Sequence, residues 1–166
     1  MEFCCEIAGS LSEGLEPLGS LGGRTVGANS SDAAFDFLAD DGARILLFGD
    51  VFYHHTPGSE IRLIDPGDDG FLASLFSRES VACAAASIEG TFVGMCVAAD
   101  GSSVEFFSDR FARLDAFWGE EDDTFVLASD LDPVFARLTP RYDQTMLAHL
   151  FAVYGWYVPK GMTIYS

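Results

Sequence analysis

The chain has 166 residues, of which 49% are hydrophobic and 13% aromatic, so we expect one domain with a real core and exclude a disordered chain. Nine Lys and Arg against 26 Asp and Glu give a net charge of -17, which argues against binding to nucleic acid or to an anionic membrane surface. No apolar run reaches the roughly 18 residues of a membrane-spanning helix. The N-terminus lacks the basic segment of a secretory signal, and the expected location is the cytoplasm.

The acidic residues are scattered along the chain, and Lys160 is the single lysine. This pattern is typical of a solvated surface and fits a salt-adapted source, where salt screens self-repulsion. The four cysteines form no CxxC or Cys/His pattern, so no metal site is predicted and a reducing compartment is the simplest. Adjacent His54 and His55 would point to opposite faces of a strand. Cys83 and Cys96 lie in apolar runs and are expected to be buried free thiols.

Two apolar runs in the first third of the chain, Phe3–Gly9 and Arg44–Phe52, predict buried strands. Between them, residues 10–31 are rich in Gly, Ser and Leu and indicate a loop with a short strand at Arg24–Val26. A helix is predicted over Ala33–Leu38, because a serine and an aspartate precede it and can cap it. The other predicted helices are Phe71–Arg78, a turn at Val134–Arg137 opened by Asp132-Pro133, and Gln144–Tyr154 capped by Asp143.

Two hairpins are predicted in the second half of the chain. Asp100-Gly101 is a typical two-residue hairpin turn, and the acidic stretch 120–123 is a second turn. The strands that these turns join are Thr91–Ala98, Ser103–Phe107, Asp115–Gly119 and Phe125–Ser129. Hairpins with helices between and after them favour an α+β fold over a wound parallel sheet.

Several segments, taken in chain order, carry a resemblance to a known family. Cys5–Gly9 is similar to a motif Cys-Gly-Ile-Ala-Gly, Phe48–His54 to Asn-Gly-Glu-Ile-Tyr-Asn, and Ile88–Phe92 to Leu-Asp-Gly-Met-Phe. The further matches are Ser108–Gly119 with Arg-Asp-Arg-Phe-Gly…Pro-Leu-Tyr-Tyr, Phe125–Val134 with Phe-Ala-Ser-Glu-Leu, and Tyr142–Tyr165 with a helix followed by Pro-x-x-Thr-hydrophobic. In this order the motifs resemble class II glutamine amidotransferases, specifically the asparagine synthetase branch.

The resemblance implies a four-layer αββα sandwich of the N-terminal-nucleophile (Ntn) type, with two antiparallel sheets between helices. It implies a single amidotransferase-like domain over residues 1–166, which we expect to be incomplete at its C-terminus. In the family, an N-terminal cysteine attacks the glutamine side-chain amide, and its own α-amine takes the thiol proton because that amine has a pKa near 8. Ammonia leaves, and water hydrolyses the thioester.

The resemblance also places roles on individual residues. Cys5 falls on the nucleophile, provided that Met1–Cys4 are removed so that Cys5 carries a free α-amine. Gly49 falls on the glycine whose backbone N–H contributes to the oxyanion hole. Arg24 is the candidate clamp for the glutamine carboxylate, and Asp50 and Glu89 are the acidic candidates for its amine.

Departures from the family pattern lower the expected activity. Phe48 stands where the family has the oxyanion-hole Asn, and a phenyl ring donates no hydrogen bond. Losing one such donor costs on the order of 3 kcal/mol in the transition state. Glu6 replaces a glycine and is expected to add negative charge where an oxyanion would form. Gly49 and Gly90 can also be kept because the fold needs them.

Three interpretations of function stay open at this point. The first is a glutaminase domain, weak or inactive, that supplies ammonia to an ATP-dependent amide-forming synthetase. The second is a non-catalytic scaffold domain of a β-lactam-synthetase-like or lasso-cyclase-like synthetase. Independently of function, the fold can require Asp109 and Arg110 as a buried ion pair or as a turn brace. The third is a glutamine-binding sensor that uses Arg24, Asp50 and Glu89.

The partners implied by the resemblance are glutamine and a synthetase, either as a further domain or as a separate chain. No cofactor is expected in this domain, while ATP and Mg²⁺ belong to the synthetase half.

Overall fold

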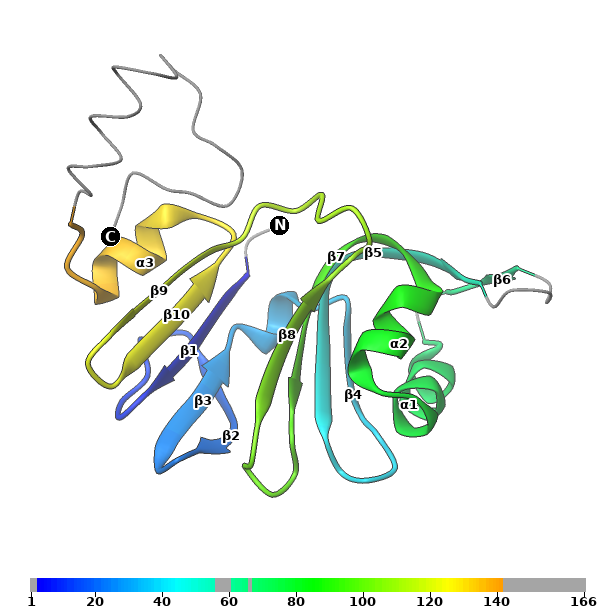
Figure 1. Ribbon diagram of the computed structural model, residues 1–166, viewed down its shortest axis with the longest axis horizontal. Coiled ribbons are helices and arrows are strands. Elements are labelled where there is room, and N and C mark those ends of the chain that lie inside the picture. The colour runs from blue at the N-terminus through cyan, green and yellow to red at the C-terminus, as the bar shows by residue number, and fades with distance from the viewer. Residues whose placement is uncertain (1–2, 56–60, 66, 142–166) are drawn as a thin grey trace, which may run out of the picture.

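Two antiparallel sheets make up the body of the protein in a computed structural model that describes residues 3–55, 61–65 and 67–141 (Figure 1). Sheet A has the strand order β2-β3-β1-β10-β9, with bounds Glu16–Leu21, Arg24–Ala28, Cys4–Ala8, Thr124–Ala128 and Phe117–Glu121. Sheet B has the order β4-β5-β7-β8, with bounds Phe35–Leu38, Arg44–His54, Ile88–Val97 and Val104–Ser108. The short strand β6 (Arg62–Leu63) pairs with β5 at the end of sheet B.

The main core lies between the two sheets. Side chains alternate along β1, so Phe3, Cys5 and Ile7 face sheet B and enter this core. Leu46 and Phe48 of β5 enter the same core from the other side. The α+β class predicted from the pattern of hairpins and helices is therefore confirmed, as is the pair of antiparallel sheets that the resemblance implies.

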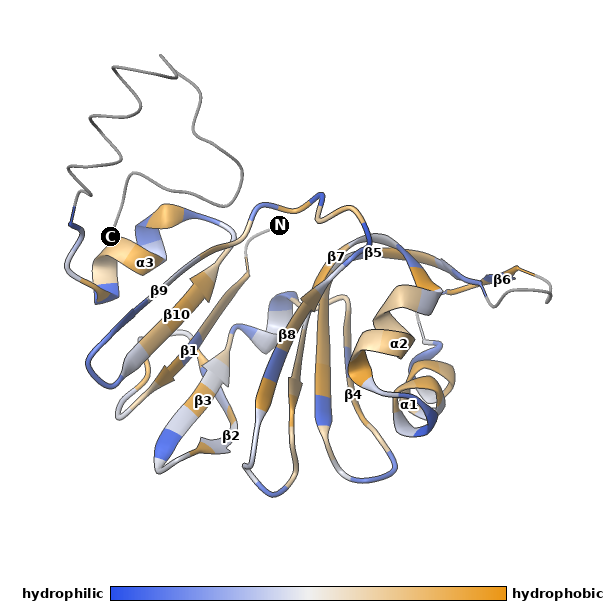
Figure 2. Ribbon diagram, viewed as in Figure 1, coloured by the Kyte–Doolittle hydropathy of each residue, from blue (hydrophilic) through white to orange (hydrophobic). Residues whose placement is uncertain are grey.

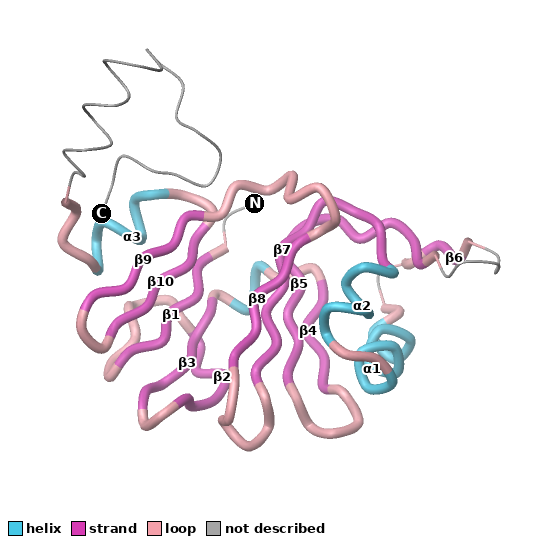
Figure 3. The backbone as a smooth tube through the Cα atoms, viewed as in Figure 1, coloured by secondary structure: helices cyan, strands magenta, loops and turns pink. Residues whose placement is uncertain are grey.

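Helices cover the outer faces of both sheets (Figure 3). On sheet B, α1 (Asp69–Arg78) and α2 (Val81–Ser87) enclose a second core. On sheet A, α3 (Leu131–Arg137) packs over β10 and β9. None of the helices in the described part of the chain has the length and apolar character needed to cross a membrane.

The strands predicted from continuous apolar runs are confirmed. In Figure 2 the long central strands β5 and β7 are mostly hydrophobic, as expected for strands covered on both faces. The two hairpins predicted in the second half of the chain are β7–β8 and β9–β10. Helix α1 is confirmed too, with a buried stripe of Leu72, Leu75 and Phe76 at helical spacing.

The predicted helix over Ala33–Leu38 is wrong, because Phe35–Leu38 forms strand β4. Phe35 and Phe37 are buried while Asp36 and Leu38 are exposed, which is the two-residue period of a strand. The serine and aspartate before it form a separate 3₁₀ turn at Ser30–Asp32. Pairing of Phe35 with Leu47 in β5 fixes the segment as an edge strand.

Strand β2 and helix α2 were not predicted, for identifiable reasons. Strand β2 lies inside the predicted loop, and its Pro17 and Gly19 flank an irregularity that is tolerated on a sheet edge. Helix α2 is a run of small residues capped by Ser80, whose side chain accepts a hydrogen bond from the Cys83 amide. The expectation that Cys83 is buried is wrong, since the helix leaves it exposed, whereas Cys96 is buried as expected. The predicted helix Gln144–Tyr154 lies outside the described residues.

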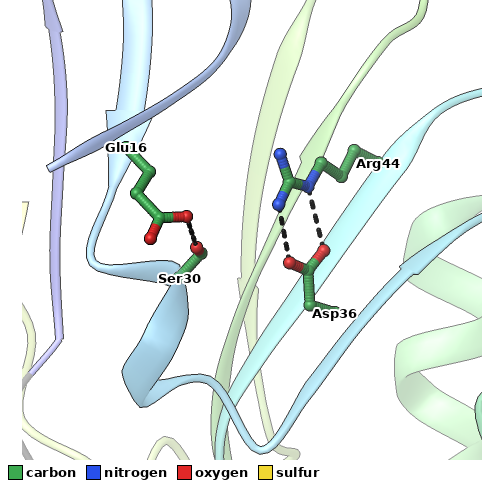
Figure 4. A network of polar contacts seen from close by, with 4 residues as sticks. All are labelled: Glu16, Ser30, Asp36 and Arg44. Atoms are coloured by element: carbon green, nitrogen blue, oxygen red, sulfur yellow. Dashed lines mark hydrogen bonds and ion pairs between the residues drawn. The ribbon is translucent and has the colours of Figure 1, made fainter.

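Two polar side-chain contacts involve the edge strands β4 and β2 (Figure 4). Arg44 of β5 binds Asp36 of β4 through two hydrogen bonds of 2.9 and 2.6 Å. Ser30 in the 3₁₀ turn donates a short hydrogen bond to Glu16 of β2. The first contact holds the edge strand β4 to β5, and the second holds the edge strand β2 to the turn that follows β3.

Candidate functional site

Cys5 lies within strand β1 and is 1% exposed. It pairs with Ala28 of β3 on one side and Leu127 of β10 on the other. The ladder continues toward the N-terminus, because the Phe3 amide donates to Ser129 Oγ at 3.1 Å and the Ser129 amide donates to the Phe3 carbonyl at 3.0 Å. Cys5 is thus an internal residue of the central strand of sheet A.

Asn29 holds the residue that precedes Cys5. The Cys4 amide donates to Asn29 Oδ1 at 2.7 Å, and the Asn29 amide donates to the Cys4 carbonyl at 3.2 Å. The Cys4 side chain points to the α3 side of the sheet, opposite to the Cys5 side chain. The peptide bond between the two cysteines therefore sits in an ordered ladder.

The segment Met1–Cys4 would have to be removed before Cys5 could act as the predicted nucleophile. Its first two residues, Met1 and Glu2, lie outside the described residues. Phe3 is described, is 2% exposed and packs in the core between the sheets. Cleavage after Cys4 would therefore withdraw a buried aromatic side chain from the core, together with the first rungs of the β1 ladder.

Burial governs the acidity of the thiols on these strands. Removal from water raises the pKa of Cys5 far above the ordinary value for a thiol, and neighbouring Cys4 adds to the effect. Burial followed by the charge of Glu6 raises the pKa of Cys4 to about 11. Burial, together with the charges of Glu105 and Asp41, raises the pKa of Cys96 to about 11. Thiolate nucleophiles are scarce at neutral pH in such surroundings.

We expect an alkylating reagent at pH 8 to label Cys83 first and to leave Cys5 unlabelled. Cys83 is exposed, while the pKa of Cys4 and Cys96 near 11 leaves roughly one thiol in a thousand ionised at this pH. Peptide mass spectrometry after timed alkylation measures this order. C83S should remove the fast phase, and unfolding in urea should expose all cysteines. Rapid labelling of Cys5 in the folded protein would contradict the buried geometry.

Phe48 shares the core between the sheets with Cys5. Its ring is 1% exposed and lies 5.6 Å from the ring of Phe3, measured between centroids. The ring is an apolar packing element in this position. It supplies no hydrogen-bond donor on the side of β5 that faces the strand of Cys5.

Glu6 does not approach the Cys5 side of the sheet, so the expectation that it adds charge at an oxyanion position is wrong. Its side chain points to the α3 side and is 1% exposed. The carboxylate accepts hydrogen bonds from the Ser12 amide at 3.0 Å and from Ser12 Oγ at 2.6 Å. Arg137 Nε of α3 lies 3.3 Å from Glu6 Oε1, an ion pair without hydrogen-bond alignment. Arg137 also donates to the Ser10 carbonyl at 2.7 Å.

Gly49 and Gly90 lie where β5 and β7 approach each other most closely. Gly49 has a φ of +113°, and a Cβ there would overlap the Thr91 carbonyl oxygen and lie 2.9 Å from Phe92 Cα. A Cβ on Gly90 would overlap the Asp50 carbonyl oxygen and lie 3.0 Å from Val51 Cα. The packing of the two backbones therefore requires glycine at both positions.

Asp50 and Glu89 share one face of sheet B. Side chains two residues apart in a strand share a face, so Asp50 points the same way as Phe48, and Glu89 the same way as Val93. Phe48 and Val93 lie in the core between the sheets, so Asp50 and Glu89 also face the sheet A side. Asp50 is exposed and stands directly opposite Thr91, while Glu89 is half-buried. This face presents two carboxylates of the charge sign that an amine ligand would need.

Arg24 lies at the far end of strand β3 from Cys5. Ala28, the register partner of Cys5, is four residues along the strand, which corresponds to about 13 Å. Arg24 Nη1 donates to the Asp123 carbonyl at 3.4 Å, in the turn between β9 and β10. The structure thus brings Gly49, Asp50 and Glu89 to one region of sheet B and leaves Arg24 at another end of sheet A.

Asp109 braces the turn that follows β8. It is 4% exposed, and its carboxylate accepts hydrogen bonds from the Phe111 amide at 2.9 Å and the Arg113 amide at 3.1 Å. Arg110 is exposed, with its guanidinium 5.8 Å from the Phe111 ring. Of the two roles expected for Asp109 and Arg110, the structure shows the turn brace.

Two arginines that the sequence did not single out hold this region together. Arg113 Nη1 donates to the Gly90 carbonyl at 3.0 Å and ties the Asp109 turn to β7. Arg137 ties α3 to β1 through Glu6. No local motif could reveal either contact, because each partner lies far away in the sequence. Within the described ranges, no group of three or more His, Cys, Asp or Glu side chains could hold a metal ion.

No family model matches the chain. No curated protein matches it with significance either.

Proposed function

We propose that the chain is a degenerate, asparagine-synthetase-like amidotransferase domain of the Ntn type that serves as a non-catalytic scaffold for an amide-forming synthetase. The observation that carries this proposal is the position of Cys5, which is 1% exposed inside a strand paired on both sides. The synthetase half would bind ATP and Mg²⁺ and would be a further domain or a separate chain.

The surroundings of Cys5 oppose nucleophilic attack. The nucleophile of this mechanism needs a base at its own nitrogen, but while Met1–Cys4 are attached the nitrogen of Cys5 is a peptide nitrogen. Burial raises the pKa of the thiol, so a thiolate forms rarely near neutral pH. Access for glutamine would require the core between the sheets to open, since Phe3 and Phe48 pack there with Cys5.

The other candidate site residues also lack features that a glutaminase needs. Phe48 provides no oxyanion-hole donor, and Gly49 is explained by the close approach of β5 and β7. Arg24 lies about 13 Å along β3 from the residue that pairs with Cys5. These features favour the scaffold over the ammonia-supplying glutaminase and over the glutamine sensor.

The test measures ammonia release from glutamine by the full chain and by its C5A variant. We expect both to release ammonia at the same background rate. If the chain releases ammonia above background and its C5A variant does not, the proposal is overturned. A chain that begins at Cys5, without Met1–Cys4, is the second arm, because it supplies the free α-amine. We expect it to stay inactive since Phe48 still lacks a donor, and brisk turnover would instead assign a glutaminase activated by processing.

Calorimetric titration with glutamine distinguishes the third interpretation, a glutamine-binding sensor, from the scaffold. We expect no saturable heat. Saturable binding without turnover would favour a sensor, and loss of that binding in D50N or E89Q would place the ligand on the acidic face of sheet B.

A further inference from the structure

A hollow of about 350 Å³ lies between helix α2 and the end of strand β8, on the outer face of sheet B. This volume falls within the range of small-molecule sites, about 300–1,000 Å³. Phe107 of β8 packs with the core that α1 and α2 enclose, whereas Cys5 belongs to the core between the sheets. The hollow is therefore separate from the residues around Cys5 and independent of the proposed scaffold role. The described residues that line it are Ala82, Ala85, Ala86, Phe107, Ser108 and Arg110.

Small side chains on α2 leave this space open. Ala82, Ala85 and Ala86 follow the i, i+3, i+4 spacing of one helix side, and each presents only a methyl group to the hollow. Helix α1, over the same sheet, buries leucine and phenylalanine side chains instead. The ring of Phe107 packs against that of Phe76, 5.6 Å away between centroids, and does not fill the gap. The walls of the hollow are therefore mostly apolar.

Arg110 supplies the charge at this hollow. In the described part of the chain it has no ion-pair partner. The carboxylate of neighbouring Asp109 instead accepts the Phe111 and Arg113 amides, at 2.9 and 3.1 Å. Ser108 Oγ, the other polar side-chain atom of the lining, already donates to the Asp109 carbonyl at 3.2 Å. The Arg110 guanidinium thus keeps its N–H donors for a ligand.

Carboxylates of the protein do not occupy this hollow. None of its described lining residues is acidic, and α2 carries no charged residue. Glu105 shares a face of β8 with Phe107, but it lies two residues away, about 7 Å along the strand. More distant charges of this acidic chain are screened over about 8 Å at physiological ionic strength. An anion at Arg110 is therefore opposed by little of the overall charge of -17.

The turn that carries Arg110 is fixed before any ligand arrives. Asp109 braces it through two backbone amides, and Arg113 Nη1 ties it to the Gly90 carbonyl at 3.0 Å. A site held in place loses less entropy on binding than a mobile one. A guanidinium binds a carboxylate through two parallel hydrogen bonds, and apolar walls bury an apolar body. We propose that this hollow binds a small apolar monocarboxylate, with its body against α2 and its carboxylate on Arg110.

Alanine methyl groups report directly on the hollow, so the test is an NMR titration of the full chain labelled with ¹³C at these methyls. Phenylacetate should shift Ala82, Ala85 and Ala86 in a saturable way, with a dissociation constant of roughly a millimolar for a ligand of about ten heavy atoms. The methyls of Ala28 and Ala128, buried in sheet A, should not move. Phenylacetamide has the same shape without the charge and should bind about tenfold more weakly. Acetate has the charge without the body and should not saturate.

Two variants test the two halves of the site. A86L fills the hollow with a larger side chain and should weaken phenylacetate binding about tenfold. R110Q removes the charge and should weaken it by a similar factor. In R110Q, phenylacetate and phenylacetamide should bind equally well, because the preference between them depends on the guanidinium.

Matched controls keep the outcome decisive. R141Q removes an arginine that is 71% exposed outside the hollow, and A116L enlarges an exposed alanine outside it, so both should leave binding unchanged. Preserved signals of Ala28 and Ala128 show that a variant is folded, and A82L replaces A86L if the latter does not fold. The absence of saturable shifts in the hollow overturns the proposal, as does equal binding of phenylacetate and phenylacetamide by the unmodified chain. Binding that survives both A86L and R110Q also overturns it.

Discussion

Replacing Gly90 with alanine is expected to lower the free energy of unfolding by about 3 kcal/mol, near the upper end for overpacked sites. A methyl group there would overlap the Asp50 carbonyl oxygen and press on Val51 Cα at 3.0 Å. Both obstacles are backbone atoms of the central strand β5, so no side-chain rotation can relieve the clash. Strands β5 and β7 would have to separate at the centre of sheet B.

Gly9 provides the matched control for this experiment. A Cβ on Gly9 would meet no heavy atom within 4 Å, so Gly9→Ala should change stability by less than about 0.5 kcal/mol. Urea unfolding followed by circular dichroism measures both variants. Equal stability of the two would mean that β5 and β7 do not approach as closely as described.

Removing the Arg137 side chain is expected to cost about 3 kcal/mol of stability, because it leaves the carboxylate of Glu6 buried without its cation. Glu6 is 1% exposed and would keep only its hydrogen bonds from Ser12. The loss should appear in R137A as a lower urea midpoint. Arg137 also holds the Ser10 carbonyl, so the loop after β1 should loosen in the same variant.

A surface ion pair and a double variant test the cause of this loss. Arg141 is 71% exposed in its pair with Glu121, so R141A should cost less than about 1 kcal/mol. Adding E6M to R137M should recover much of the stability lost in R137M alone, since no buried charge remains. If the double variant is as unstable as the sum of its parts, packing rather than charge explains the contact.

The sequence predicted elements whose signal is local. Continuous apolar runs predicted β1 and β5, turn residues predicted the two hairpins, and a stripe at helical spacing predicted α1. It failed where tertiary pairing overrides local preference. The segment Phe35–Leu38 is short and preceded by capping residues, and only its pairing with β5 makes it a strand.

In the candidate site too, some features follow from the local sequence and others depend on tertiary contacts. Strand alternation in the sequence already places Cys5 and Glu6 on opposite faces of β1, so the position of Glu6 was within reach of sequence reasoning. That Arg137 would meet Glu6, and that Arg113 would bind the Gly90 carbonyl, could not be predicted. Those contacts depend on how α3 and the Asp109 turn pack, which no nearby pattern encodes.

The strand order also sets the sequence of events during synthesis on the ribosome. All strands of sheet B lie between Phe35 and Ser108, so this sheet can pair before the rest of the chain is translated. Strand β1 is made long before its partner β10, which is complete only when Ala128 emerges. Until then β1 can pair only with β3, and its other hydrogen-bonding edge stays open to chaperones or to mispairing.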